Sequence, residues 1–249
     1  MSVQKNPPLA LIGENSNKFI EKGLSENGFK VIPLPCDNRL SPQVSSHADM
    51  LIFSIDDMIF CNEIYYNTHK HIFEIIESYG YKINHSDFCV SNEYPNDVSL
   101  NQAIIGKNVI GRKDVCAKNI LEYLKKNDYA YCSVKQGYAK CSTLILNDKA
   151  IICADSGITS IAQTLNVKTL KIENGINEIT LDGYNYGFIG GASVVFKNKV
   201  FFFGDLSLHS QGKEIAKFCK DNGFSPISLG TERLCDIGGA IILPYINGK

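Results

Sequence analysis

A short phrase that the chain repeats constrains its fold more than any other feature: two apolar arms around a polar tip. The phrase is clear in "LILNDKAIIC" and "VVFKNKVFFF", and it occurs at four places, with tips at Asp56, Lys107, Asp148 and Asn198. Tips rich in Asn, Asp, Gly and Lys suit tight turns in which some residues take positive φ. The arms are short and rich in Val, Ile and Phe, which favour strands. Each phrase is therefore predicted to be a β-hairpin.

The tips recur roughly every 40 to 50 residues, a period typical of repeat architectures. The same interval after the fourth tip leads to Asn247-Gly248, where one apolar arm, Ala240–Leu243, has no returning partner. A spare apolar arm lies at the other end of the chain, at Leu9–Gly13. We expect these two arms to pair, because the pairing would remove sheet edges that invite aggregation.

A helix-like segment and a further short strand follow each predicted return arm. After Leu9–Gly13, a helix is expected to begin beyond a cap at Ser16 or Asn17 and to stop at Gly28. The predicted helices lie within 14–28, 62–80, 112–127, 155–165 and 205–223, and the strands after them at 29–34, 81–86, 129–134, 167–172 and 224–229. No Pro/Ser-rich linker divides the chain, so we expect residues 1–249 to form a single α/β domain.

Composition excludes some functions. The formal net charge is -1, which gives no basic surface for nucleic acid or for a membrane, so neither is expected as a partner. The N-terminal apolar stretch is short and interrupted by Gly13 and Glu14, unlike a signal peptide, and no window approaches the roughly 20 apolar residues of a spanning helix. The 9 cysteines form no CxxC pair and are expected to be reduced thiols. We therefore expect a soluble, cytoplasmic protein.

Five strand-strand-helix-strand units, completed by the N-terminal strand, resemble the pentein superfamily. That superfamily includes arginine deiminases, dimethylarginine dimethylaminohydrolases, glycine amidinotransferases and agmatine deiminases, and also a non-catalytic ribosome anti-association factor, translation initiation factor six. The resemblance implies a five-bladed, pseudo-fivefold ββαβ propeller, closed by pairing of the N- and C-terminal strands. It also implies a central pore lined by residues just ahead of each hairpin. Because the fold serves both enzymes and a binding protein, it does not fix the function.

The resemblance places candidate ligand-binding groups ahead of the first two hairpins. Asp49 stands where the hydrolases grip the guanidinium of their substrate with an acid, with His47 close by and Asp37 upstream. A carboxylate suits this role, because its two oxygens match the paired N–H groups of a planar cation. A turn-capping role for Asp49 is the alternative. Ahead of the second hairpin the candidates are Asp97, Asn101 and Gln102.

The two groups that define the covalent chemistry of the family are missing from their expected places. Ahead of the third hairpin, where the hydrolases carry a catalytic His, this chain has Tyr138, with Lys140 two residues later. Ahead of the fifth arm, where the enzymes carry their nucleophilic Cys, it has Gly238-Gly239. Cys235 comes three residues too early, and Asp236 stands beside it.

The other histidines do not suggest a metal site. His69 and His71 are two residues apart on a predicted helix and would point to different sides, whereas a metal pair would prefer a spacing of four. His209 falls near the start of another predicted helix and is expected at the surface. Neither a metal nor a cofactor is expected.

Three functional hypotheses follow. The first is a pentein-fold protein that binds a small polar or cationic ligand, of guanidino or amidino type, in its pore. Its candidate binding residues are Asp37, Asp49, Asp97, Asn101, Gln102, Lys140 and Asp236.

The second hypothesis is an amidine or guanidine hydrolase with a displaced nucleophile, Cys141 or Cys235, and His47 as its base. Lys140 precedes Cys141, and its positive charge could lower the pKa of that thiol. Two ordinary half-buried thiols are the alternative.

The third hypothesis is a non-catalytic module that binds a protein or the ribosome. A ribosome-binding module would favour a basic face, and the overall charge shows no such excess.

Overall fold

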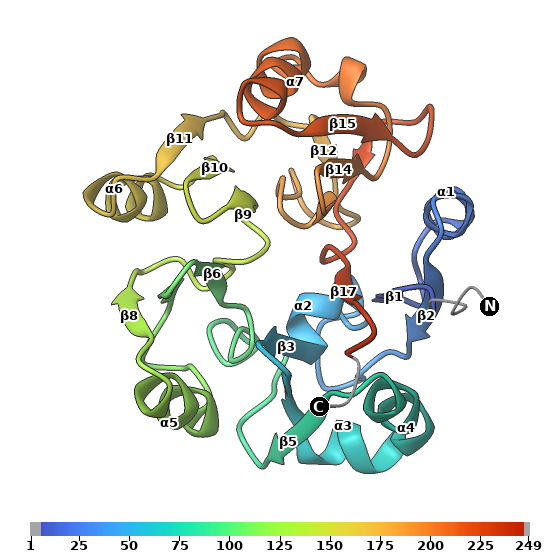
Figure 1. Cartoon of the computed structure of the whole chain (residues 1–249), viewed down its shortest axis with the longest axis vertical. Coiled ribbons are helices and arrows are strands. Elements are labelled where there is room, and N and C mark those ends of the chain that lie inside the picture. The colour runs from blue at the N-terminus through green and yellow to red at the C-terminus, as the bar shows by residue number, and fades with distance from the viewer. Residues whose placement is uncertain (1–5, 247–249) are drawn as a thin grey trace, which may run out of the picture.

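The computed structural model describes residues 6–246 and consists of small sheets with helices around them (Figure 1). Five sheets have three strands in the same order, in which a central strand pairs antiparallel with one neighbour and parallel with the other. The sheets are β17–β1–β2 (Ile241–Leu243, Leu9–Gly13, Lys30–Leu34), β3–β4–β5 (Ile52–Ile55, Met58–Asn62, Lys82–Ser86), β6–β7–β8 (Ala103–Ile105, Asn108–Gly111, Ala130–Ser133), β9–β10–β11 (Thr143–Asn147, Ala150–Cys153, Lys168–Lys171) and β13–β14–β15 (Ser193–Phe196, Lys199–Phe202, Ser225–Ser228).

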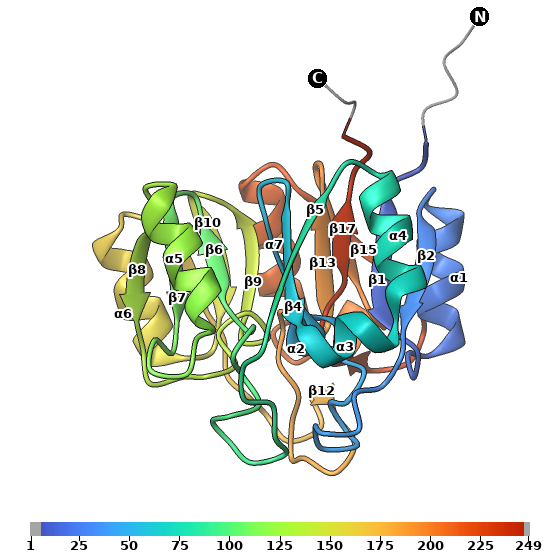
Figure 2. The same ribbon diagram turned by 90° about the horizontal axis from the view of Figure 1, so that it is seen from below.

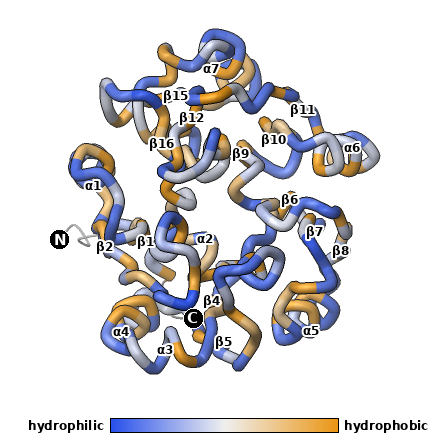
Figure 3. The backbone as a smooth tube through the Cα atoms, turned by 180° about the vertical axis from the view of Figure 1, so that it is seen from behind, coloured by the Kyte–Doolittle hydropathy of each residue, from blue (hydrophilic) through white to orange (hydrophobic). Residues whose placement is uncertain are grey.

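Helices connect each central strand to its parallel neighbour and lie on the outside of the molecule (Figure 1). They are α1 (Lys18–Glu26), α3 (Glu63–Thr68) with α4 (Lys70–Ser78), α5 (Lys118–Lys126), α6 (Ser156–Thr164) and α7 (Gly212–Asp221), which follows the 3-10 helix η1 (Leu206–Leu208). Each packs an apolar face inward, as Ile120 and Leu124 do in α5, and keeps polar residues outside (Figure 3). None of the described helices combines the length and the apolar character needed to cross a membrane.

The predicted strands are confirmed within a few residues, and helices lie inside each predicted helical segment, two of which are divided. Segment 205–223 contains η1 and α7. The predicted helix 62–80 is divided into α3 and α4 at His69, whose backbone leaves the helical region with φ -122° and ψ 35°. The side chain of Asn62 begins α3 by accepting the N–H of Ile64 at 3.0 Å. The second unit therefore covers its sheet with two short helices.

The four predicted hairpins each close through two residues. Asp56, Gly106 and Lys197 take the left-handed conformation that such turns require, with φ of 53°, 58° and 55°. In the third hairpin, Asp148 lies at the tip between β9 and β10. The fifth tip expected at Asn247-Gly248 lies outside the described residues.

The predicted pairing between the two ends of the chain is also confirmed. Strand β1 pairs antiparallel with β17, with Leu9 opposite Leu243 and Leu11 opposite Ile241. Each sheet stays open, and no sheet formed by residues 6–246 closes on itself. The first sheet is thus assembled from residues that are more than two hundred positions apart in the sequence.

The arrangement brings several long loops together at one end of the molecule. The hairpin strands β3, β6, β9, β13 and β17 lie innermost (Figure 1), and β9 adjoins both β6 and β13. Figure 2 shows the loops that precede β3, β6 and β13 at the end opposite the described termini. A short parallel pair, β12 (Ile179–Thr180) with β16 (Leu234–Cys235), joins the loop before β13 to the loop before β17. The helix α2 (Ala48–Leu51) leads into β3.

We expect Leu11→Ala to lower the free energy of unfolding by about 2–5 kcal/mol, because it leaves a cavity in the core cluster into which Leu11 packs. Leu11 is 0% exposed and lies opposite Ile241 and Ile32 in those strands. Urea denaturation is the measurement. Ile64→Ala, at a side chain that is 55% exposed, is the control and should change stability by less than about 0.5 kcal/mol. Equal effects of the two substitutions would contradict the packing of β1.

Candidate functional site

Cys141 lies where three of the loops meet. Its thiol donates a hydrogen bond to Asp49 Oδ2 at 2.8 Å, and Asn101 Nδ2 lies 3.5 Å from its sulfur. Asn101 Oδ1 accepts the backbone N–H of Lys140 at 2.8 Å and that of Cys141 at 3.2 Å. The loop before β6 therefore fixes the position of a thiol that belongs to the loop before β9, and Asp49, Asn101 and Cys141 are all buried.

An imidazole and a second carboxylate stand beside this thiol. The ligand atoms of His47, Cys141 and Asp236 all lie within 4.8 Å of one another. Asp236 is oriented by two backbone N–H groups, that of Phe188 at 2.8 Å and that of Gly238 at 2.9 Å. Imidazole, thiolate and carboxylate are also ligands of zinc-type ions, so these three residues could hold a metal that the histidine spacing did not predict.

Glycines bring these groups together. Gly238 has φ +75°, and a Cβ built on it would clash with the side chain of His47. A Cβ on Gly191 would clash with the carboxylate of Asp236. At Gly238, one of the two positions where the resemblance expects a nucleophilic Cys, the space for a side chain is therefore taken by His47 from the loop before β3.

Two cavities open on the cluster. The first, of about 270 Å³, is bordered by His47, Cys141 and Asp236 and by four aromatic rings. The rings are those of Tyr138, Tyr184, Tyr186 and Phe188. The second, of about 450 Å³, is more polar; it shares His47 and Asp236 with the first and is also bordered by Cys235. The two cysteines proposed as displaced nucleophiles thus face different cavities, with His47 between them.

Burial keeps the thiol protonated. It raises the pKa of Cys141 well above its ordinary value, and the charges of Asp49 and Asp236 raise it further. Lys140 lowers the pKa of this thiol, as its sequence position suggested, but its effect is outweighed. The amine of Lys140 donates to Gly190 O at 3.2 Å and borders a different cavity.

Asp49 carries a buried polar atom without a partner. Its side chain is 3% exposed, and Oδ1 makes no hydrogen bond with any described residue. Burial raises the pKa of Asp49, although the charges of Lys140 and His47 oppose this effect. Unpaired buried oxygens are rare in folded proteins and call for an explanation.

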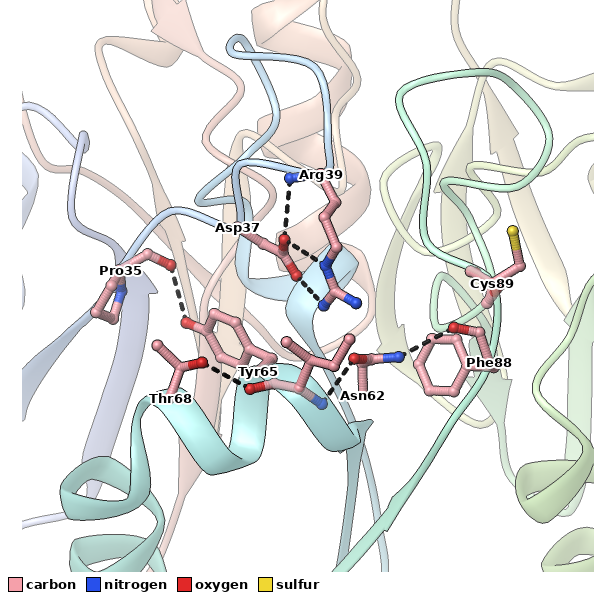
Figure 4. A network of polar contacts seen from close by, with 10 residues as sticks. Pro35, Asp37, Arg39, Asn62, Tyr65, Thr68, Phe88 and Cys89 are labelled. Carbon is pink, nitrogen blue, oxygen red and sulfur yellow. Dashed lines mark hydrogen bonds and ion pairs between the residues drawn. The ribbon is translucent and has the colours of Figure 1, made fainter.

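Other predicted residues lie outside the cluster. Asp37 forms a two-point ion pair with Arg39, so its carboxylate is already satisfied within its own loop (Figure 4). Gln102 accepts the hydroxyl of Tyr131 in β8. Cys235 lies in β16 and is approached by Asn17 Nδ2 at 3.6 Å.

Asp97 reaches the first cavity only through Tyr138. Its Oδ2 accepts the hydroxyl of Tyr138, which fixes that ring in the cavity wall. Tyr138, which stands where the family's histidine is expected, is therefore part of a hydrogen-bonded aromatic wall.

The prediction for His209 was wrong. This residue was expected at the surface, but it is 3% exposed and its Nδ1 accepts the N–H of Gln211 at 3.0 Å.

Sequence reasoning missed the aromatic wall supplied by the loop between β12 and β13. This loop contributes Tyr184, Tyr186 and Phe188 to the first cavity. The signal was available as the run "YNYGF", in which aromatic residues are concentrated between polar ones. The run has no strand or helix period, so nothing in the pattern indicated which way its rings would face.

Solved structures of three enzymes resemble this chain over nearly its whole length. A dimethylarginine dimethylaminohydrolase from Pseudomonas aeruginosa, solved with citrulline, is 12% identical and aligns over 96% of this chain and 99% of its own, with a TM-score of 0.57. An amidinotransferase of saxitoxin biosynthesis from Microseira wollei is 11% identical over 98% and 96% of the chains, with a TM-score of 0.60. The agmatine deiminase of C. jejuni is 8% identical over 98% and 95%, with a TM-score of 0.56. The chain therefore has the α/β fold of the pentein superfamily.

Sequence comparison gives a family without an assigned activity. No curated protein sequence matches the chain. The model of a family of unknown function, DUF6873, matches residues 11–241, which include every residue of the Cys141 cluster. The chain belongs to this DUF6873 family.

Proposed function

We propose that this protein binds a small organic cation of guanidino or amidino type in the first cavity. The observation that carries the proposal is the pair of buried acids beside Cys141, Asp49 and Asp236, which form no salt bridge with a described Lys or Arg, although the charge of Lys140 acts on Asp49. Asp49 and Asp236 are each 3% exposed, and the amine of Lys140 is directed at Gly190 O. Unpaired buried charge is costly, and a bound cation would remove that cost.

The groups at the cavity floor suit a planar cation. Asp236 offers carboxylate oxygens, Cys141 offers a sulfur, and the ring of His47 makes no hydrogen bond with another described residue. Guanidinium and amidinium ions present several N–H donors in one plane, which match acceptors held at a fixed spacing. Asp49 lies directly behind Cys141 and adds its charge through the low-dielectric interior, where screening is weak.

An organic cation fits this cavity better than a bare metal ion. A metal would need only three or four ligand atoms, whereas the cavity has about 270 Å³ of space and an aromatic wall. Each oxygen of Asp236 already accepts a backbone N–H, which reduces its capacity as a metal ligand. The metal alternative is tested below.

The fold offers a setting for this proposal. The similar structures are enzymes named for dimethylarginine, for amidino transfer and for agmatine. The common strand order of the five sheets supports an arrangement as a five-bladed propeller, in which residues 1–249 form one domain and the cavity lies at the pore.

Cations should stabilise the protein, and neutral molecules of the same shape should not. Methylguanidine, acetamidine and benzamidine are expected to raise the thermal unfolding temperature with concentration, because they bind the folded state alone. Methylurea, acetamide and benzamide are the neutral controls. Asp49→Asn should weaken cation binding by at least about tenfold, which is about 1.4 kcal/mol. Asp148→Asn, at an exposed hairpin tip, should leave it unchanged.

Two results would count against the proposal. One is a flat response of the wild-type protein to every cation. The other is stabilisation by Zn²⁺ alone that Cys141→Ser abolishes, which would identify the cluster as a metal site.

The buried acid should cost stability at neutral pH. Because the pKa of Asp49 is raised above 3.8 in the folded state, the folded chain holds more protons than the unfolded chain above pH 3.8, and stability falls as pH rises through that window. Asp49→Asn should therefore be more stable than the wild type at pH 7, with the gain disappearing below pH 3.8. Urea denaturation across pH measures this, with Asp148→Asn as the control. A less stable Asp49→Asn at pH 7 would refute the assignment.

A second candidate function is a cysteine hydrolase, favoured by the proximity of His47 to Cys141. His47 would take the proton of the Cys141 thiol, the thiolate would add to the central carbon of a bound amidinium, and ammonia or an amine would leave with that proton from the imidazole. Water would then release the product and restore the thiol. The resemblance places the His and Cys of the enzymes ahead of the third and fifth hairpins; here they stand ahead of the first and third, with the same separation of two sheets.

The cation site should direct alkylation to Cys141. 2-Chloroacetamidine, whose amidinium resembles the proposed ligand, is expected to label Cys141 at least about tenfold faster than neutral 2-chloroacetamide does. Burial keeps this thiol protonated. A bound amidinium would bring a positive charge beside it, which lowers the pKa of the thiol and so speeds its alkylation. Peptide mass spectrometry measures the rates, with exposed Cys89 as the internal reference. Labelling of Cys141 and Cys235 no faster than that of Cys89 would end this candidate.

A further inference from the structure

We infer that the ligand of the first cavity is a monocation with an aromatic or apolar body and without a carboxylate. This inference rests on the proposed binding of a cation and adds what the rest of the ligand must be. The observations are the composition of the cavity wall, the absence of Lys and Arg from the described lining of both cavities, and a histidine that borders both.

The aromatic residues that border the first cavity beside Asp236 include rings that contact one another. Tyr138 stacks on Tyr94, with centroids 5.6 Å apart and planes 27° apart, and its centroid is 6.1 Å from that of Phe188. Tyr186 meets Phe188 edge to face at 5.8 Å. Such faces attract both cations and flat apolar groups. A ligand whose charged end reaches Asp236 therefore lays its remaining atoms against aromatic carbon.

No lysine or arginine among the described residues is placed to receive a carboxylate. Among the described residues, neither of the two cavities is bordered by Lys or Arg. Lys140 borders another cavity, and Arg39 is committed to Asp37. The second cavity adds Asp182 to the acids already present. A ligand carboxylate would lose water without gaining an ion pair with Lys or Arg, and Asp236 and Asp182 would repel it, which would select against amino acids.

His47 offers a ligand at this place a further polar contact. Its side chain is 5% exposed, it borders both cavities, and its ring makes no hydrogen bond with a described residue. A ligand donor or acceptor would satisfy it. The volume of about 270 Å³ is near the lower end of the roughly 300–1,000 Å³ common for ligand pockets, which suits one ring with one charged group.

Four matched compounds test the inference by titration calorimetry on the full chain. Phenylguanidine has the charge and the ring, methylguanidine the charge alone, phenylurea the ring without the charge, and 4-guanidinobenzoate adds a carboxylate. We expect phenylguanidine to bind tightest. Methylguanidine and 4-guanidinobenzoate should each bind at least about tenfold more weakly, and phenylurea should not bind measurably.

A variant in the wall tests which atoms hold the ring. Tyr186 is 38% exposed, so Tyr186→Ala should fold. This substitution should weaken the binding of phenylguanidine by about tenfold and leave the binding of methylguanidine unchanged, because only the aromatic contact is lost. Tyr245→Ala, at a tyrosine that is 42% exposed and borders neither cavity, is the matched control and should change neither affinity.

The outcomes separate this inference from the proposed function. Binding of 4-guanidinobenzoate or methylguanidine as tightly as phenylguanidine would overturn the inference and leave cation binding intact. Failure of every guanidine to bind would overturn both.

Discussion

The antiparallel pairing of β17 with β1 is the interaction on which the site depends. It places the loop that carries Asp236 and Gly238 next to the loop that carries His47. Without it, the first and last units would not share a sheet, and the imidazole of His47 and the carboxylate of Asp236 would not be brought together in space. The pairing is made by apolar strands whose side chains are largely buried, so the same burial that stabilises the fold assembles the cluster.

Much of the fold could be predicted from the sequence, because its signals are local. Two-residue tips such as that at Asp56, the stop at Gly28 and the alternation of arms and helices are each decided within a few residues. The break at His69 and the β12–β16 pair could not be predicted in this way. The first depends on how two short helices cover one sheet. The second joins segments of two residues that carry no strand period and gain their pairing only from the folded context.

The candidate site was predictable as a set of loops but not as a set of contacts. The residues ahead of the hairpins include Asp49, Asn101, Cys141 and Asp236, which the structure brings together. Asp37 looked equivalent in sequence, yet a neighbouring arginine two positions later already pairs with it. Which acid is left without a partner depends on such pairings, and these are decided by side-chain direction. The spacing of residues along the chain does not record that direction.

The β12–β16 pair has a mechanical consequence for recognition. It ties the segment before the aromatic loop to the strand that leads into Asp236, while Phe188 donates its own N–H to that same carboxylate. The aromatic loop and Asp236 are thus held to each other by these contacts, so the cavity is formed before a ligand binds. For the ligand proposed above, little ordering entropy would then remain to be lost on association.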